Sequence, residues 1–261
     1  MKDSTTMNIQ VLVAAINQED HSLINKMNIQ TDAIIGNQNK KVNSVEEFDY
    51  NGHHIKYLNF VEKGVGLNRN NALMRATGDI CLFADDDMRY VDGYSQVIEE
   101  AFNKCVDADV IVFNLIEPVP TRYIIKKMSR VGKMNYLRYG TARIAVKLKS
   151  IKKNGIYFNQ CFGGGTEHCH GEDNIFLTSC LRAGLKIYAV PVTIAALTEE
   201  RKSTWSRGYD NKYIVDQGYL YRAISRKYWK ILCLQDAIRR SKRDYKMPWY
   251  TAYKIMKGCS K

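Results

Sequence analysis

Three consecutive carboxylates follow a short apolar run in the stretch DICLFADDDMRY, residues 79–90. The run 80–84 has the composition of a buried strand, and Asp85, Asp86 and Asp87 come directly after it. Adjacent carboxylates repel one another and resist losing their hydration, so they are costly at the tip of a buried strand. A hard divalent cation removes that cost, because it prefers oxygen ligands. The stretch therefore suggests a metal site, although an acidic cluster alone is more often a solvated turn.

A glycine-containing segment, GVGLNRNNA at residues 64–72, precedes the aspartates. Gly64 and Gly66 permit a tight turn into a helix whose free N–H groups would face an anion. Arg69 stands where a G-x-G-x-x-G dinucleotide motif has its third glycine, so that motif is not present. Taken alone, the segment is equally compatible with an ordinary strand-to-helix loop.

A third candidate segment is GGGTEHCHGED, residues 163–173. Glu172 and Asp173 fall in the first turn of a predicted helix, where the helix dipole favours an ionised carboxylate. A carboxylate held ionised near a cleft suits a general base. Simple capping of the helix is the alternative for this segment alone.

The histidines and glycines of this segment are expected to form a mobile loop on the acceptor side of a site. The spacing of His168, Cys169 and His170 matches no zinc pattern. A short aromatic and basic segment at 203–213 is predicted to act as a lid, because aromatic faces stack on sugars or bases and arginine pairs with phosphate. The candidate lid or acceptor residues are Gly164, Gly165, His170, Trp205, Arg207 and Tyr209.

Elements that would position these residues alternate between strand and helix along the first half of the chain. The predicted strands are 10–16, 32–36, 80–84 and 110–114, with a hairpin over 48–60 that turns at Asn51-Gly52 and helices over 21–27, 67–76 and 93–104. This alternation predicts an α/β fold with a mainly parallel sheet covered on both faces. Ligands of such sheets bind at the carboxyl ends of the strands, where the three aspartates lie.

The second half is less regular. We expect a strand over 141–151, a loop over 161–173, a helix over 172–183, a strand over 185–192 and basic helices from about residue 204.

The composition of the 261 residues, 45% hydrophobic and 25% charged, is that of a globular protein. No apolar run approaches the roughly 18 residues of a membrane-spanning helix. The N-terminus lacks the apolar core of a signal peptide. The seven cysteines show no C-x-x-C spacing, which favours reduced thiols in a cytoplasmic protein.

Positive charge is concentrated in two segments of a chain whose formal net charge is +12. Residues 219–261 carry twelve Lys and Arg against two Asp, and a second basic block spans 122–153. The expected partners are therefore phosphates, anionic lipid or nucleic acid. Apolar residues occur at helical spacing in the basic tail, which suits either a helix on an anionic membrane surface or packing on the catalytic domain. They are Ile231, Leu234, Ile238, Trp249, Tyr253 and Met256.

Taken together, the three candidate segments resemble the family 2 glycosyltransferases of GT-A fold over about residues 8–200. The resemblance implies an inverting enzyme that uses a nucleotide-sugar, usually a UDP-sugar, with Mn²⁺ or Mg²⁺. Asp85 and Asp87 match the D-x-D motif, with Asp87 as a direct metal ligand. Asp173 matches the base of a Glu-Asp pair with Glu172. Arg69 matches an arginine near the nucleotide.

The donor contacts implied by the resemblance come from several strand ends. They are Ala15, Asn17, Asn37, Gln38, Arg69, Asp85 and Asp86. Residues Gly36, Asn37 and Gln38 stand where the family often has an acidic residue after the second strand, and Asn37 or Gln38 would hydrogen-bond a uracil. The third metal ligand stays open between the phosphates and a later acidic group such as Glu199, Glu200 or Asp210.

The function expected from these features is transfer of a sugar to a saccharide or lipid-linked acceptor in bacterial surface-polysaccharide synthesis. The enzyme would be cytoplasmic, or peripheral at the inner face of the cell membrane. We expect a catalytic domain over 1–203, divided at about residue 115 into nucleotide-sugar and acceptor halves, and a lid and basic extension over 204–261. A nucleotidyltransferase, a catalytically inactive sugar-binding relative and a nucleic-acid-binding protein are alternatives, although no nucleic-acid-binding signature appears.

Overall fold

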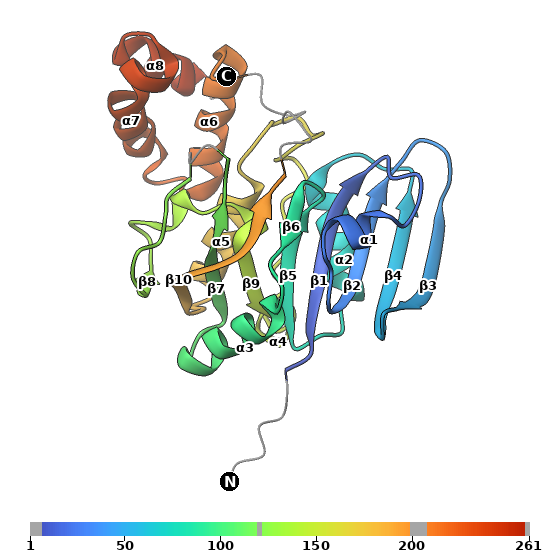
Figure 1. The fold of residues 1–261 in the computed structure, drawn as a ribbon. Coiled ribbons are helices and arrows are strands. Elements are labelled where there is room, and N and C mark those ends of the chain that lie inside the picture. The colour runs from blue at the N-terminus through green and yellow to red at the C-terminus, as the bar shows by residue number, and fades with distance from the viewer. Residues whose placement is uncertain (1–6, 119–121, 199–207, 259–261) are drawn as a thin grey trace.

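The computed structural model describes residues 7–118, 122–198 and 208–258. Among these residues a ten-stranded sheet runs in the order β3-β4-β2-β1-β5-β9-β7-β10-β6, and β8 pairs with β10 (Figure 1). The strands are β1 (Ile9–Ile16), β2 (Asp32–Gln38), β3 (Ser44–Tyr50), β4 (His53–Phe60), β5 (Ile80–Asp85), β6 (Met88–Tyr90), β7 (Val110–Ile116), β8 (Ser129–Val131), β9 (Ile144–Lys147) and β10 (Ile187–Leu197). The helices are α1 (Leu23–Lys26), α2 (Val65–Arg75), α3 (Tyr94–Lys104), α4 (Leu148–Lys153), α5 (Glu172–Arg182), α6 (Asn211–Ile224), α7 (Trp229–Arg240) and α8 (Trp249–Lys257). Three short turns complete the elements: η1 (Tyr136–Arg138), η2 (Thr141–Arg143) and the π-helical η3 (Ser241–Tyr245).

The predicted α/β fold is confirmed. Strands β4, β2, β1 and β5 run parallel, as do β7 and β10, while β3, β6, β8 and β9 pair antiparallel with their neighbours. In the parallel register Ala14 lies beside both Gly36 and Asp85. The ends of three strands therefore meet where the sequence places the carboxylates.

Alternate residues of the central strand face the two covering layers. Val11 and Val13 belong to the apolar cluster that includes α1 and α3. Leu12 belongs to the other cluster, with residues of α2 and α5. This double burial explains why the strands read as nearly continuous apolar runs.

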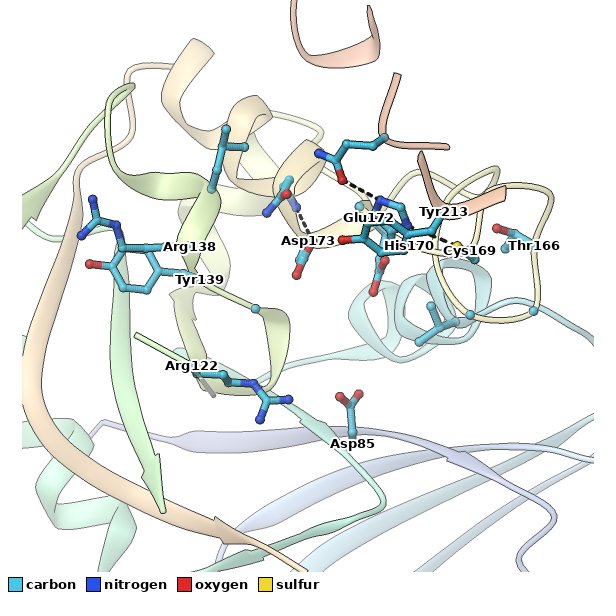
Figure 2. Close-up of a pocket in the computed structure, with 18 of the residues that line it drawn as sticks. Asp85, Arg122, Arg138, Tyr139, Thr166, Cys169, His170, Glu172, Asp173 and Tyr213 are labelled. Carbon is cyan, nitrogen blue, oxygen red and sulfur yellow. Dashed lines mark hydrogen bonds between the residues drawn. The ribbon is translucent and has the colours of Figure 1, made fainter. Parts of the chain in front are cut away.

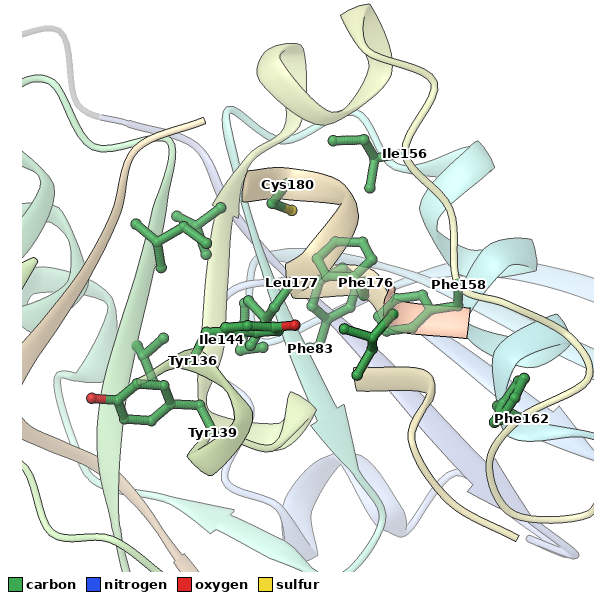
Figure 3. Close-up of a cluster of buried hydrophobic side chains, with 14 of the residues drawn as sticks. Phe83, Tyr136, Tyr139, Ile144, Ile156, Phe158, Phe162, Phe176, Leu177 and Cys180 are labelled. Atoms are coloured by element: carbon green, nitrogen blue, oxygen red, sulfur yellow. The ribbon is translucent and has the colours of Figure 1, made fainter. Parts of the chain in front are cut away.

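Three phenylalanines tie β5 to α5 beneath the strand ends (Figure 3). Phe83 makes edge contacts with Phe158 at 5.0 Å and Phe176 at 5.4 Å between ring centroids, and the latter two stack at 4.4 Å. Aromatic pairs add about 0.5–1.5 kcal/mol each beyond the area they bury. Because Phe83 lies two residues before Asp85 and Phe176 one helical turn after Glu172, this cluster fixes the two acidic segments relative to each other.

Local sequence signals account for most of the element boundaries. Asn51 and Gly52 both have positive φ, 51° and 81°, as a two-residue hairpin turn with matching twist requires. The strand predicted over 141–151 is wrong in extent, because β9 covers only four residues of it. The η2 turn precedes β9, and α4 follows because Leu148 and Ile151 are buried one helical turn apart.

The C-terminal helices α6, α7 and α8 form a layer above the edge where the parallel strands end (Figure 1). Their inner faces belong to the same apolar cluster as α2 and α5. Of the residues proposed from sequence to contact a membrane, Met256 is fully buried, whereas Ile231, Ile238 and Trp249 are 63%, 57% and 46% exposed. No helix within the described ranges is long and apolar enough to span a bilayer.

Candidate active site

A cavity of about 1440 Å³ opens at the carboxyl edge of the sheet, between the strand ends and the C-terminal helices. Asp85, Asp86 and Asp87 line it from β5, and Glu172 and Asp173 line it from the start of α5. Figure 2 shows Asp85 at the strand edge, on the side that faces Glu172 and Asp173. The structure therefore brings two of the three predicted segments together at one cavity, 85 residues apart in the chain.

The third segment contributes Arg69, which bridges the other two. Its guanidinium donates to Asp85 Oδ1 at 2.6 Å and to Glu172 Oε1 at 2.8 Å, and its side chain is only 4% exposed. Burial alone would lower the pKa of Arg69, but the charges of Asp85 and Glu172 outweigh burial and raise it. Arg69 therefore binds two carboxylates at once and fixes their spacing.

The start of α2 differs from the expected anion site. Gly64 takes φ 114°, which favours glycine, and the helix begins at Val65. The Val65 N–H donates to the Gly164 carbonyl at 2.9 Å, so this amide serves the 163–165 loop. Gly163 lies against Glu172, because a Cβ at this position would come within 2.8 Å of the Glu172 carboxyl group.

The aspartates differ in their surroundings. Asp86 Oδ2 accepts from the Ile16 N–H and from Gln18 Nε2, both at 3.1 Å, so Asp86 secures the end of β1. Thr198 bonds to the backbone carbonyl of Asp87. Burial, followed by the charges of Asp85 and Asp86, raises the pKa of the Asp87 carboxyl group.

This environment fits a divalent cation. A carboxylate whose ionised form is destabilised by like charges is stabilised by a cation placed among them. Hard cations such as Mn²⁺ and Mg²⁺ prefer oxygen ligands, and the carboxylates of Asp87 and Asp85 could provide them. Asp210, one of the later acidic groups considered from sequence, lines the cavity but also caps α6 through the Tyr213 N–H at 2.8 Å.

Asp173 has the properties of a proton acceptor near neutral pH. It opens α5 after Gly171, as predicted, and its Oδ1 accepts from the Asn174 N–H at 2.7 Å. Burial, followed by the charge of Glu172, raises the pKa of Asp173 to about 7, while Arg69 acts in the opposite direction. A carboxylate with this pKa is both available as a base at neutral pH and basic enough to take a proton in a reaction.

The loop that precedes Asp173 is fastened to α6 by a fully buried aspartate. Asp216 accepts from the Cys169 N–H at 2.9 Å and from Lys212 Nζ at 2.6 Å, and it lies 3.0 Å from His168 Nδ1. Burial opposes ionisation, but the hydrogen bonds from Lys212 and from the Cys169 amide outweigh it and lower the pKa of Asp216. His170 continues the attachment through Gln217 at 2.9 Å.

Cys169, His170 and Asp216 also form the one group of three potential metal-ligating side chains found within the described residues. Both carboxylate oxygens of Asp216 are already engaged, by Lys212 on one side and the Cys169 amide on the other. A cation would have to displace these contacts. We therefore interpret this group as a structural attachment of the loop.

The predicted donor residues divide into two sets. Ala15 and Gln38 line the cavity, as do Arg69 and the aspartates. Asn17 and Asn37 are not among its lining residues. The Asn37 amide donates to the Gln18 carbonyl at 2.9 Å and to Asn59 Oδ1 at 2.7 Å, and its Oδ1 accepts from the Gln18 N–H, so it joins neighbouring strand ends.

The predicted lid and acceptor residues also divide. Gly164, Gly165 and His170 line the cavity. Tyr209 is 46% exposed and makes an edge contact with Tyr213, whose ring stacks on His170 at 4.1 Å. Trp205 and Arg207 lie outside the described residues.

Sequence reasoning missed four polar residues that belong to this region. Arg122, Lys133 and Arg138 line the cavity from the basic block 122–153, which was recognised only as a charge run. Figure 2 shows Arg138 and Tyr139 on one side of Asp173, with His170 and Tyr213 on the other. Asp216 was also missed, although its i, i+4 spacing from Lys212 on a helical segment was visible in the sequence.

An α/β sheet with aspartates at the end of a central parallel strand, faced by a Glu-Asp pair that opens a helix, defines a glycosyltransferase of GT-A fold. The family model for glycosyl transferase family 2 matches residues 15–163, and the chain belongs to this family. A search of the curated proteins gave no match.

Solved structures with the same fold include those of S. aureus TarS 1–349. Its complex with UDP-GlcNAc aligns with a TM-score of 0.64 at 16% identity, covering 92% of this chain and 74% of that one. The complex with UDP aligns at 0.59 and 16% identity, covering 97% and 70%. A third structure of TarS 1–349 aligns with a TM-score of 0.58 at 13% identity, covering 97% of this chain and 91% of that one. At these identities the likeness establishes the fold.

Proposed function

We propose that the chain transfers a sugar from a UDP-sugar to a hydroxyl group of a saccharide or lipid-linked acceptor, with inversion and with a divalent metal. One observation carries the proposal: the Asp85–Asp87 cluster and Asp173, with its pKa of about 7, share one cavity. The described complexes of TarS with UDP-GlcNAc and UDP support UDP as the nucleotide. Synthesis of a bacterial surface polysaccharide is the pathway we infer.

The reaction follows from the placement of Asp173. Its carboxylate takes the proton of the acceptor hydroxyl, whose oxygen forms a bond to the anomeric carbon of the donor. The bond from that carbon to the diphosphate oxygen breaks on the opposite face, so the configuration inverts and the nucleoside diphosphate leaves. Burial, followed by the charge of Glu172, which Arg69 holds in place, raises the pKa of Asp173 and makes it an effective base.

Asp87 and Asp85 would hold Mn²⁺ or Mg²⁺ at the strand edge. A bound dication supplies charge stabilisation for the diphosphate leaving group. Arg69 contributes indirectly, because its contact with Asp85 keeps that carboxylate in place. Asp86 secures the end of β1 beside Ala15.

Calorimetric titration of UDP with and without Mn²⁺ tests the donor site. We expect the wild-type chain to bind UDP in a metal-dependent manner and Asp87→Ala to lose the metal-dependent part. Asp49→Ala is the control, because it removes an exposed carboxylate on β3 that does not line the cavity. Release of UDP from a panel of UDP-sugars then identifies the sugar, whereas pyrophosphate release would indicate a nucleotidyltransferase. Equal UDP binding by wild type and Asp87→Ala in the presence of Mn²⁺ would contradict the metal assignment.

The outer face of the C-terminal layer supports peripheral contact with an anionic membrane. Ile231, Ile238, Trp249 and Tyr250 are 46–63% exposed there. Exposed lysines such as Lys230 flank them. Apolar side chains flanked by lysine and arginine are typical of helices that lie at a membrane surface. Such contact would bring the cavity to a lipid-linked acceptor.

A further inference from the structure

The cavity is larger than a single small-molecule site requires. Its 1440 Å³ exceeds the roughly 300–1,000 Å³ of ordinary ligand pockets. The strand ends with Asp85–Asp87 would account for the donor. The remaining wall, from the 133–140 segment and the C-terminal helices, is available for the acceptor.

That remaining wall carries cations. Lys133 and Arg138 line it from one segment, and Arg239 lines it from the end of α7. All three are exposed, and none has a carboxylate within 4.0 Å among the residues that the structure describes. Arg138 lies 4.5 Å from the ring centroid of Tyr123, which restricts its guanidinium without neutralising it.

Helix α7 lines the cavity with one face and makes its other contacts with different faces. At about 100° per residue, its positions form three faces. Cys233 and Ala237 are buried in the core, and Ile231 and Ile238 face outward. The third face lines the cavity and contains Leu232, Gln235, Asp236, Arg239 and Arg240.

The two adjacent arginines at the end of α7 have different roles. Arg240 is bound by Asp244 at 2.7 Å and lies against the rings of Tyr209, Tyr213 and Tyr245, so it is part of the packing of the C-terminal layer. Among the described residues, Arg239 makes none of these contacts. Its charge at the cavity wall is therefore available to a ligand.

We propose that the acceptor carries phosphate groups and that Lys133, Arg138 and Arg239 bind them; this specifies the acceptor of the proposed function. Cations from two separate segments suit phosphate, because its tetrahedral oxygens accept hydrogen bonds from several directions. Arginine donates to such oxygens in pairs, which favours binding of defined geometry. The phosphates belong either to a phosphodiester-linked chain or to a lipid diphosphate.

Titration of two phosphate-bearing probes into the protein saturated with UDP and Mn²⁺ tests this proposal. The probes are a tetramer of glycerol phosphate and farnesyl diphosphate, with glycerol and farnesol as their neutral counterparts. We expect one of the charged probes to bind while its neutral counterpart does not, and the one that binds identifies the source of the phosphate. We expect Arg239→Gln to weaken that binding about tenfold, as for loss of one charge-assisted hydrogen bond.

Lys242→Gln is the matched control, because it removes an equal charge from an exposed position that does not line the cavity. Equal weakening by Lys242→Gln and Arg239→Gln would reduce the effect to general electrostatics and overturn the proposal. Failure of both probes to bind, or their displacement by UDP, would also overturn it. A chain that binds a probe but not UDP would retain the phosphate site and lose the proposed donor, so the two failures are distinguishable.

Discussion

The raised pKa of Asp173 predicts a specific dependence of transfer on pH. A carboxylate is a base only when ionised, so activity should rise with pH through a pKa of about 7. Between pH 6 and pH 8 the ionised fraction of such a group increases about tenfold, whereas a carboxylate of ordinary pKa is fully ionised throughout this range. We therefore expect kcat/KM for the acceptor to rise about tenfold over this interval.

The assay is UDP release at saturating donor, measured at several pH values for the wild type and two variants. Asp173→Asn should lower the rate by about 10² to 10⁴ and remove the pH dependence, as expected for loss of a general base. Glu172→Gln removes the like charge that raises the pKa of Asp173, so the rise in activity should move to lower pH. A rate that stays constant between pH 6 and pH 8 in the wild type would refute the reasoning.

The same pKa makes a prediction for stability. The folded state binds the Asp173 proton more tightly than the unfolded state, whose pKa is near 3.8. The stability contributed by the neutral carboxyl group is therefore complete below about pH 4 and is lost as pH rises through about 7. Asp173→Asn should raise the melting temperature at pH 8 and leave it unchanged at pH 4. An equal change at both pH values would show that the variant acts through packing.

Two further predictions concern the buried ion pairs and the outer face. Arg69→Met should lower the free energy of unfolding in urea by about 3–5 kcal/mol, because it leaves two carboxylates without their cation. Arg69→Lys should lower the free energy of unfolding by less. An Arg69→Met variant as stable as the wild type would contradict the bridging role. Ile238→Ser should weaken flotation with vesicles of phosphatidylglycerol several-fold, because it removes an apolar contact. Ile116→Ser, at a similarly exposed isoleucine on β7, should not, and equal flotation of the two variants would exclude this face.

The sequence was informative where local patterns decide structure. The strand 80–84, the Asn51-Gly52 hairpin and the helix that begins at Glu172 all follow from composition or turn chemistry within a few residues. The strand predicted over 141–151 was too long. Its first three residues form the turn η2, whose last residue, Arg143, is buried and donates to the Phe113 carbonyl. Such a contact, 30 residues away in the chain, is not encoded in the local pattern.

The candidate site shows the same division. Residue types and their neighbours in the sequence singled out Asp85, Asp87 and Asp173 as candidates, and all three line the cavity. The position of Arg138 at the cavity could not be predicted, because it depends on which of many basic residues the fold turns toward the cavity. Asn37 is the opposite case. It stands where the family resemblance implies a donor contact, but its side-chain amide joins neighbouring strand ends.

The joint spacing of three sequence segments was more informative than any single segment, and Arg69 provides the physical reason. Its guanidinium contacts carboxylates 16 and 103 residues away in the chain, so all three segments must be correctly placed for any of them to be satisfied. The rings of Phe83 and Phe176 fix the same two segments from below. Asp85 and the Glu172–Asp173 pair are thereby held by one ion-pair network and one apolar cluster, and a change in either would be transmitted to both acidic segments.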